Sequence, residues 1–225
     1  VPGGLLAFIK TEAGLELPDI EFMFRGMPFD ADIWFPGIKR RYEDGFGIRP
    51  CLLYPESRGT VRLRSDDPHD APRISYGFFT EPGDIEKLRA GVKIGRELIR
   101  HPVMAPFAGD QVVPLKPLNT DEEIDAFIRQ EAATASHPLG TCKMGTDRDA
   151  VVDTDLKVHG VEGLRVVDAS VMPDMVGAHI NAAVIMIAEK ISDSIRGKVP
   201  SMIAAKAKNL RHQPTYIHPA SSGPG

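Results

Sequence analysis

The chain has 225 residues, of which 42% are apolar and 26% are charged, and its formal net charge is -4. This composition is that of an ordinary globular protein, large enough for one large or two modest domains. The acidic balance and the scattered Lys and Arg residues exclude a nucleic-acid-binding face, and no apolar run approaches the roughly 18 residues that a membrane span requires. We therefore expect a soluble protein without nucleic-acid or membrane-spanning contacts, cytoplasmic rather than secreted.

The start of the chain and its cysteines carry further information. The sequence opens with Val1 and Pro2, with neither an initiator Met nor a signal segment, so we expect the chain to have been cut or numbered from inside a longer polypeptide. Cys51 and Cys142 stand far apart without a CxxC spacing. This favours two buried thiols over a structural zinc site, and one long-range disulfide stays open as an alternative.

The first eighty residues have the texture of a β-rich region. Short apolar or alternating runs at 20–24, 48–54 and 60–64 are separated by Gly, Pro and Asp. The alternation is clearest in 60–64 and predicts an antiparallel sheet with one solvated face. The segment 26–47, which contains the only Trp, Trp34, has no clear period; an ordinary long loop and an active-site loop are both open.

From Pro82 onward the apolar spacing becomes helical and predicts a helix that ends near His101. A second helix is expected after Thr120, because Thr120 and Glu123 have the spacing of a capping box. Further on, the pattern predicts a short strand at 164–167.

The last expected element is a helix over 181–196. Its first half is apolar nearly all round, which predicts a buried start, and Gly197 is a C-cap signal. Residues 198–225 are polar and rich in Pro, Gly and Ser, which predicts an extended tail or an arm lying on a partner.

Two histidines, His137 and His179, lie in the most specific part of the sequence. A neutral imidazole is well suited to take a proton from an alcohol near neutral pH. His179 also falls at the expected start of a helix, where unpartnered N–H groups and the helix dipole stabilise an anion. Taken singly, each histidine is more often structural, His137 as a loop residue stiffened by Pro138. Taken together, they favour a catalytic site.

Other candidate residues surround these histidines. Asp168 follows the strand expected at 164–167, where its carboxylate either binds a ligand hydroxyl or caps the turn. His137, Cys142 and His159 are metal-ligand types, but no carboxylate or paired ligand stands at a usual spacing, so we expect no metal site. No G-x-G-x-x-G occurs, so the chain has no phosphate-binding loop of its own.

Several runs of the sequence resemble the C-terminal half of the glucose-methanol-choline (GMC) oxidoreductase family of flavoenzymes. The matching runs are 55–65, 137–145, 152–153, 158–173 and 179–190. The likeness covers nearly the whole chain up to Gly197, and it is most specific from His137 to Lys190.

The resemblance implies a fold of the α+β/α/β kind. Residues 1–133 would form an antiparallel-sheet substrate domain covered by helices. Residues 134–197 would supply the C-terminal strand and helix of a Rossmann-like FAD-binding domain, and 198–225 would be the tail. Since the start of that domain is absent here, the implied partners are the N-terminal FAD-binding polypeptide of the same enzyme, FAD and a small alcohol substrate. A homo-oligomer stays open.

The resemblance also assigns roles to individual residues. His137 matches the principal catalytic base of the family, and His179 matches a second position that is His or Asn in different members. Five positions match those that line the flavin: Asp168, Ala169, His179, Ile180 and Asn181. The implied reaction oxidises a primary alcohol to the aldehyde, with the proton passing to His137 and the hydride to flavin N5. The aromatic residues around Trp34 hint at an aromatic substrate.

Two departures from the family and two other functions remain to be weighed. Many members carry Asn where this chain has His179 and Pro where it has Ala183. A hydroxynitrile lyase, in which the flavin is retained but redox-silent, is an alternative on the same fold. A non-catalytic binding or assembly subunit is an alternative from another class. Oxygen and other electron acceptors are both open.

Overall fold

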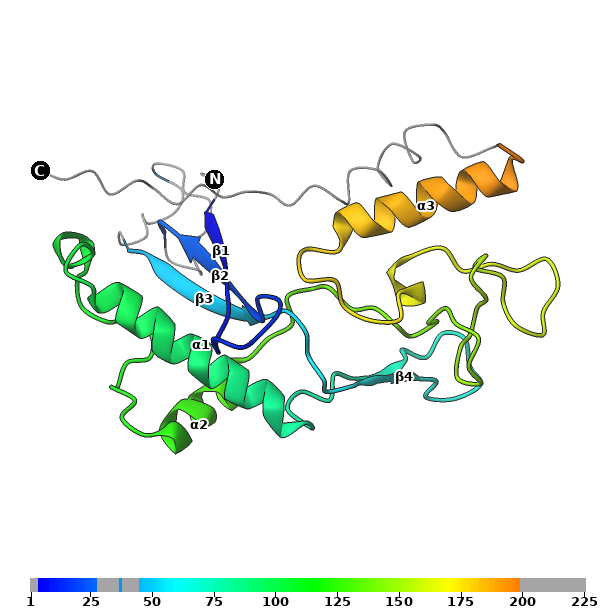
Figure 1. Ribbon diagram of the computed structural model, residues 1–225. Coiled ribbons are helices and arrows are strands. Elements are labelled where there is room, and N and C mark those ends of the chain that lie inside the picture. Colours follow the sequence, from blue (N-terminus) through cyan, green and yellow to red (C-terminus); the bar gives the residue numbers. More distant parts are fainter. Residues whose placement is uncertain (1–3, 28–36, 38–44, 199–225) are drawn as a thin grey trace, which may run out of the picture.

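The computed structural model describes residues 4–27, 37 and 45–198 (Figure 1). Trp34, most of the 26–47 segment and the tail from residue 199 lie outside the described residues. The elements, in chain order, are β1 (Leu5–Ile9), β2 (Ile20–Arg25), β3 (Gly47–Leu52), β4 (Thr60–Arg62), β5 (Arg73–Ser75), α1 (Pro82–Arg100), the 3-10 turn η1 (Ala105–Phe107), α2 (Asp121–Glu131), the 3-10 turn η2 (Ala169–Val171) and α3 (Asn181–Ile195).

Two antiparallel sheets organise the first half of the described chain. β1, β2 and β3 form one sheet with β2 at its centre, and β4 and β5 form a separate hairpin. The three predicted strands correspond to β2, β3 and β4, which confirms the antiparallel expectation. The sequence did not predict β1, because most of its residues are exposed and its apolar residues do not alternate with polar ones. Among the described strands, β1 pairs with β2.

Helix α1 covers one face of the three-stranded sheet (Figure 1). Gly91 and Gly95 lie one turn apart on this helix and permit its close approach. A Cβ on Gly91 would lie 3.2 Å from the Pro50 Cβ, and one on Gly95 would lie 3.6 Å from the Phe22 ring. Ile20 and Phe22 of β2 are therefore sealed beneath α1, at 0% and 3% exposure.

Helix α2 packs on the outer side of α1 and begins as the sequence predicts. The Thr120 hydroxyl accepts the Glu123 N–H at 3.2 Å, and the Glu123 carboxylate accepts the Thr120 N–H at 3.2 Å, so the capping box is confirmed. A buried cluster of Ile85, Ile124 and Ile128 joins the two helices. No helix in the described part of the chain is long and apolar enough to cross a membrane.

Between α2 and α3 the chain is irregular apart from the short η2 turn. The buried cluster of this second half of the described chain consists of Val152, Leu156, Val171 and Ile191. The strand predicted at 164–167 does not form: in this stretch Arg165 makes one isolated antiparallel bridge, to Lys157. A strand needs a ladder of partners, and no such ladder runs beside this stretch in the described part of the chain. The predicted division into domains at residue 133 stays a prediction.

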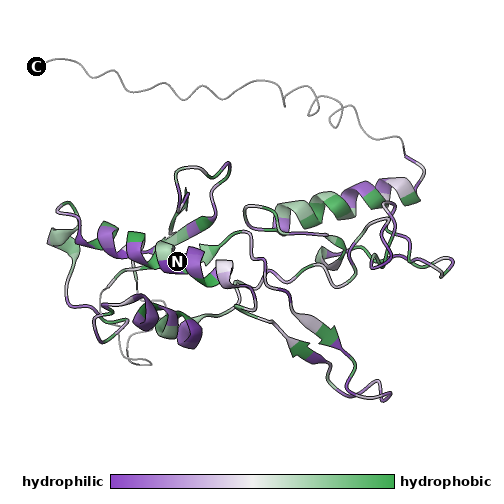
Figure 2. Ribbon diagram, turned by 60° about the horizontal axis from the view of Figure 1, so that its bottom comes forward, coloured by the Kyte–Doolittle hydropathy of each residue, from purple (hydrophilic) through white to green (hydrophobic). Residues whose placement is uncertain are grey.

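Helix α3 begins and ends as expected, and Gly197 takes the left-handed conformation, φ +64°, that a C-cap requires. The expectation of a buried start is wrong. Ile185 and Met186 are 54% and 56% exposed, and Ile191 is the buried residue of the helix. Figure 2 shows the apolar first half of this helix, whose outer side has no neighbour among the described residues.

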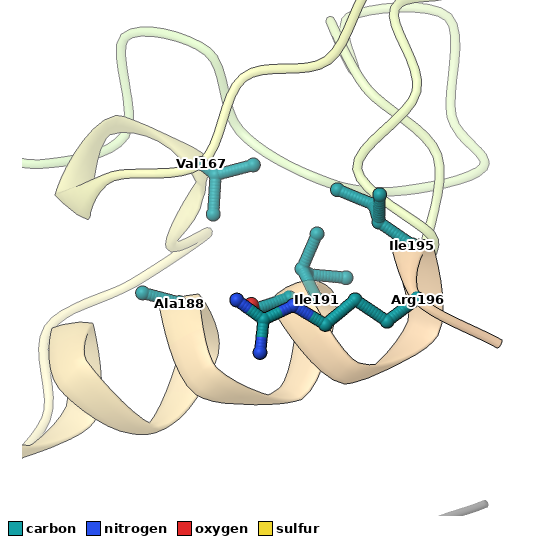
Figure 3. Close-up of a pocket in the computed structure, with 6 residues that line it drawn as sticks. Val167, Ala188, Ile191, Ile195 and Arg196 are labelled. Atoms are coloured by element: carbon teal, nitrogen blue, oxygen red, sulfur yellow. The ribbon is translucent and has the colours of Figure 1, made fainter. Parts of the chain in front are cut away.

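A shallow groove lies between α3 and the stretch that carries Val167 (Figure 3). Its lining residues are Val167, Ala188, Ile191, Ser192, Ile195 and Arg196. None of them is one of the candidate catalytic residues, so this groove is separate from the two histidines.

Asp84 at the start of α1 gives a test of the fold. Its side chain is buried, and its carboxylate accepts the backbone N–H groups of Glu56 at 2.8 Å and Ser57 at 2.9 Å. Burial by itself would raise the pKa of Asp84, but the hydrogen bonds from Glu56 and Ser57 and the charge of Lys87 hold it below the usual value near 3.8. The segment 55–59 is thereby anchored to the helix.

We expect Asp84→Asn to lower the free energy of unfolding by about 1.5–3 kcal/mol near pH 7. The asparagine NH₂ group replaces one of the two acceptor oxygens, so the backbone N–H of Glu56 or of Ser57 loses its acceptor. Since the folded-state pKa of Asp84 is lowered, its contribution is complete above the ordinary carboxyl pKa and is lost as the pH falls through the lowered value. Urea unfolding should therefore show the gap between the two proteins narrowing below about pH 4. A gap of equal size at pH 7 and pH 3 would contradict this account.

Candidate active site

The structure brings His137 and His179 together. His137 lies in the loop that follows α2, and His179 lies in the turn that leads into α3. Nε2 of His137 and Nδ1 of His179 are 3.3 Å apart, and the two ring centroids are 5.0 Å apart, although 42 residues separate them in the chain. The two imidazoles are thus within contact distance of each other, and their action on one substrate atom stays a prediction.

Backbone hydrogen bonds hold the loop after His137 against the segment that leads towards His179. The N–H of Cys142 donates to the Ser170 carbonyl at 2.9 Å, and that of Met144 donates to the Val171 carbonyl at 2.8 Å. The chain turns immediately before His137 through Ser136, which has a φ of +61°. Functional side chains on loops require such a rigid support.

A third residue, Glu21, completes the arrangement. Nε2 of His179 is 3.1 Å from Glu21 Oε1, a contact across 158 residues of sequence. The Glu21 side chain is 3% exposed, whereas that of His179 is 45% exposed. Glu21 alternates on β2 with Ile20 and Phe22, which lie under α1, so its side chain leaves the opposite face of the sheet. One imidazole thus contacts both a buried carboxylate and a second imidazole.

Sequence analysis missed Glu21. The available signal was a single acidic residue inside an apolar strand, between Ile20 and Phe22. The two-residue period of a strand places such a residue on the solvated face of a sheet. Here that face is covered by the turn that carries His179, a contact that strand periodicity does not reveal.

The surroundings of Glu21 are partly dehydrated. Cys51 lies directly opposite Glu21 in the pairing of β2 with β3, so the two side chains share a face of the sheet. Burial raises the pKa of the Cys51 thiol, and the Glu21 carboxylate raises it further. Cys51 is a free thiol, as is Cys142. The structure thus contains no disulfide between Cys51 and Cys142, the alternative that the sequence had left open.

The other predicted site residues lie around the turn between Asp168 and α3. Asp168 is exposed, and one of its carboxylate oxygens accepts the Ser170 N–H at 2.7 Å, so it caps the η2 turn. Ala169 is half-buried within that turn. Ile180 is buried, at 7% exposure, and Asn181 is the exposed first residue of α3. Their role towards a cofactor stays a prediction.

The start of α3 fits an anionic or electron-rich group. Its N-cap residue is Ile180, whose side chain makes no capping hydrogen bond. Within the described residues, no N-cap side chain therefore accepts the first-turn N–H groups of this 15-residue helix, and these groups carry the positive end of the helix dipole. The neighbouring Ala178 and Ala182 are small and exposed, so a flat ring can approach the backbone there.

Comparison with known proteins identifies the family. Residues 55–188 match the family described as GMC oxidoreductase, in its C-terminal domain. The chain belongs to the GMC oxidoreductase family. Homologues in this family use FAD.

Individual relatives support this GMC assignment. The chain is 39% identical over 193 residues to an oxygen-dependent choline dehydrogenase of Proteus mirabilis, covering 86% of this chain and 34% of that protein. It resembles a pyridoxine 4-oxidase structure from Mesorbium loti with a TM-score of 0.74 and 28% identity, covering 86% and 38% of the two chains. A fungal aryl-alcohol oxidase gives a TM-score of 0.63 and 34% identity, with 79% and 27% covered. The chain spans about a third of the length of the curated relatives it matches.

The contact between Glu21 and His179 can be tested directly in this GMC chain. We expect Glu21→Leu to free the His179 ring, because the acceptor at Nε2 is removed, whereas the amide oxygen of Glu21→Gln can still accept. Nitrogen-15 NMR of the histidine rings should show a hydrogen-bonded Nε2–H in the wild type and in Glu21→Gln, and no such signal in Glu21→Leu. An unchanged His179 signal in Glu21→Leu would show that the contact does not orient the ring.

Proposed function

We propose that this chain is the C-terminal part of an FAD-dependent alcohol oxidoreductase that oxidises a primary alcohol to the aldehyde. The proposal rests on the row formed by Glu21, His179 and His137. His179 Nε2 lies 3.1 Å from Glu21 Oε1, and His179 Nδ1 lies 3.3 Å from His137 Nε2. Such an arrangement offers two imidazole nitrogens to a single substrate oxygen. We place His137 as the catalytic base and His179 as the group that holds the oxygen.

The proposed mechanism needs a particular placement of the protons. We place the Nε2–H of His179 towards Glu21, because an ionised carboxylate only accepts, and this leaves Nδ1 facing His137. The mechanism also places a proton on Nδ1, so that His179 can donate to the substrate oxygen. Nε2 of His137 then keeps a lone pair, which is what a general base needs.

A substrate hydroxyl fits this arrangement without large movement. An oxygen about 2.8 Å from both His137 Nε2 and His179 Nδ1 lies at the apex of a triangle on the observed 3.3 Å base. In that position it accepts the Nδ1–H of His179 and donates its own proton to His137. The alcohol is thereby activated and oriented at the same time.

FAD, when bound, supplies the acceptor for the hydride that leaves the alcohol carbon. The residues present fit this cofactor, because the uncapped start of α3 with small residues beside it can stabilise negative charge on a flat ring. Asn181 and the backbone at His179 and Ile180 would hold it there. Asp168 and Ala169 would line it from the η2 turn.

The remaining two thirds of such an enzyme would be the N-terminal FAD-binding polypeptide. The exposed Ile185 and Met186 on α3 support this proposal, since large apolar side chains on a regular helix usually contact a partner. The shallow groove of Figure 3 supplies further apolar surface along the same helix.

Three of the relatives support the proposed substrate class. Choline, aryl alcohols and pyridoxine, on which the relatives act by name, each carry a primary alcohol group. A histidine pair that grips one oxygen recognises this common group and leaves the rest of the substrate to other residues. The aromatic segment around Trp34 remains our candidate for that second role.

The base is tested by His137→Ala in the flavin-loaded enzyme. Because general base catalysis is typically worth about 10²–10⁴-fold, we expect anaerobic flavin reduction by the alcohol to slow by that factor while the flavin stays bound. Stopped-flow absorbance measures the rate. His69→Ala, which alters an exposed histidine in the turn after β4, is the matched control and should leave the rate unchanged. Equal rates in His137→Ala and the control would refute the assignment.

A further inference from the structure

The ring of Tyr54 packs against the backbone at Gly177, two residues before His179. A Cβ built on Gly177 would lie 2.0 Å from the Tyr54 Oη and 2.8 Å from its Cζ, well inside any normal contact distance. Gly177 does not have a positive φ, so its backbone conformation would suit other residues. A larger residue here would therefore meet the tyrosine ring and not a backbone restriction.

The segment that carries Tyr54 is firmly held. The N–H of Leu53 donates to the Asp19 carbonyl at 2.9 Å, which extends the pairing of β3 with β2 up to the residue before Tyr54. On its other side, the amides of Glu56 and Ser57 bind the buried Asp84 carboxylate. Tyr54 therefore lies in a segment, residues 53–57, that is hydrogen-bonded to the sheet at one end and to the start of α1 at the other.

The segment that Tyr54 touches is the irregular stretch 173–179, which ends in His179. A second contact between the two segments is the ion pair of Arg58 with Asp174, at 3.2 Å. Both of these side chains are more than 60% exposed, so the pair adds little to the stability of the contact. Of these two contacts, the packing of Tyr54 on Gly177 lies nearer to His179 in the chain and involves the less exposed side chain.

We propose that Tyr54 is a positioning residue for His179. Its ring fixes how closely the turn approaches the sheet, and so fixes whether His179 reaches Glu21 and His137 together. The contacts at 3.1 and 3.3 Å tolerate little displacement, since a hydrogen bond weakens steeply beyond its normal length. This inference rests on the proposed function, because it concerns the same histidine.

A size-swap series in the flavin-loaded enzyme tests the proposal. Gly177→Ala must displace either the Tyr54 ring or the turn. The proposal requires that the turn moves, and anaerobic flavin reduction should then slow on the order of 10²-fold, the loss that a displacement of about 1 Å can cause. Tyr54→Ala removes the ring and should cost on the order of 10-fold. The double variant Gly177→Ala/Tyr54→Ala should recover to the rate of Tyr54→Ala, because nothing is left to overlap. Gly177→Ala/Tyr54→Phe should stay slow, since the ring atom at 2.8 Å remains.

Arg58→Ala is the matched control, because it cuts the second contact between the same segments and should leave the rate nearly unchanged. A double variant Gly177→Ala/Tyr54→Ala that is slower than both single variants would overturn the proposal, as would a Gly177→Ala enzyme with the full rate. Should Gly177→Ala not fold, Tyr54→Ala decides alone, since it creates no overlap.

The His179 ring provides a readout without catalysis. Nitrogen-15 NMR of the resting enzyme should show the hydrogen-bonded Nε2–H of His179 weakened in Tyr54→Ala and retained in Arg58→Ala. An unchanged signal in Tyr54→Ala would overturn the positioning role. Because this measurement needs no substrate, it separates failure of the inference from failure of the proposed function, which would appear as unimpaired flavin reduction in His137→Ala.

Discussion

The hydrogen bond between His179 and Glu21 joins the two halves of the described chain at the point where the candidate chemistry takes place. On one side, Glu21 is fixed in the central strand of a sheet that is backed by α1. On the other side, His179 stands at the end of a turn that is supported by the cluster of Val171 and Ile191. A carboxylate as buried as Glu21 is costly without a partner, so the sheet and the turn depend on each other's placement.

This dependence explains why local signals in the sequence predict some elements and not others. Three boundaries are determined by a few neighbouring residues each, and all three are confirmed: the start of α1 at Pro82, the capping box at Thr120 and the end of α3 before Gly197. By contrast, β1 exists because β2 pairs with it, and a strand at 164–167 would need partners that the described chain does not place beside it. Such elements depend on tertiary neighbours, which propensity and periodicity do not encode.

The candidate site divides in the same way. His137 and His179 stand out through the residues around them, and the structure confirms that they meet. Glu21 and Tyr54 belong to a strand and a loop whose local sequence gives no reason to link them to a histidine more than 100 residues away. Their roles follow from a distance of 3.1 Å in one case and a close contact with Gly177 in the other. The two histidines can be found from the sequence, whereas Glu21, which contacts His179, and Tyr54, which packs against Gly177, are found only from the structure.

The relatives carry names that refer to different substrates. Choline dehydrogenase, aryl-alcohol oxidase and pyridoxine oxidase are similar to this chain along most of its length, yet their names indicate quite different molecules. A histidine pair that recognises a hydroxyl group is compatible with all of them. Differences in specificity must then come from residues that contact the rest of the substrate, as expected when function resides in sites placed on a shared fold.

The central claim is that the histidine pair serves alcohol oxidation, with the electrons passing to a flavin. Anaerobic mixing of the flavin-loaded enzyme with a panel of primary alcohols, followed by absorbance, tests it most directly. The account predicts that at least one alcohol bleaches the oxidised flavin and that the matching aldehyde accumulates in equal amount. A flavin that stays oxidised while a cyanohydrin is cleaved to its aldehyde would contradict the claim and identify a lyase on the same fold.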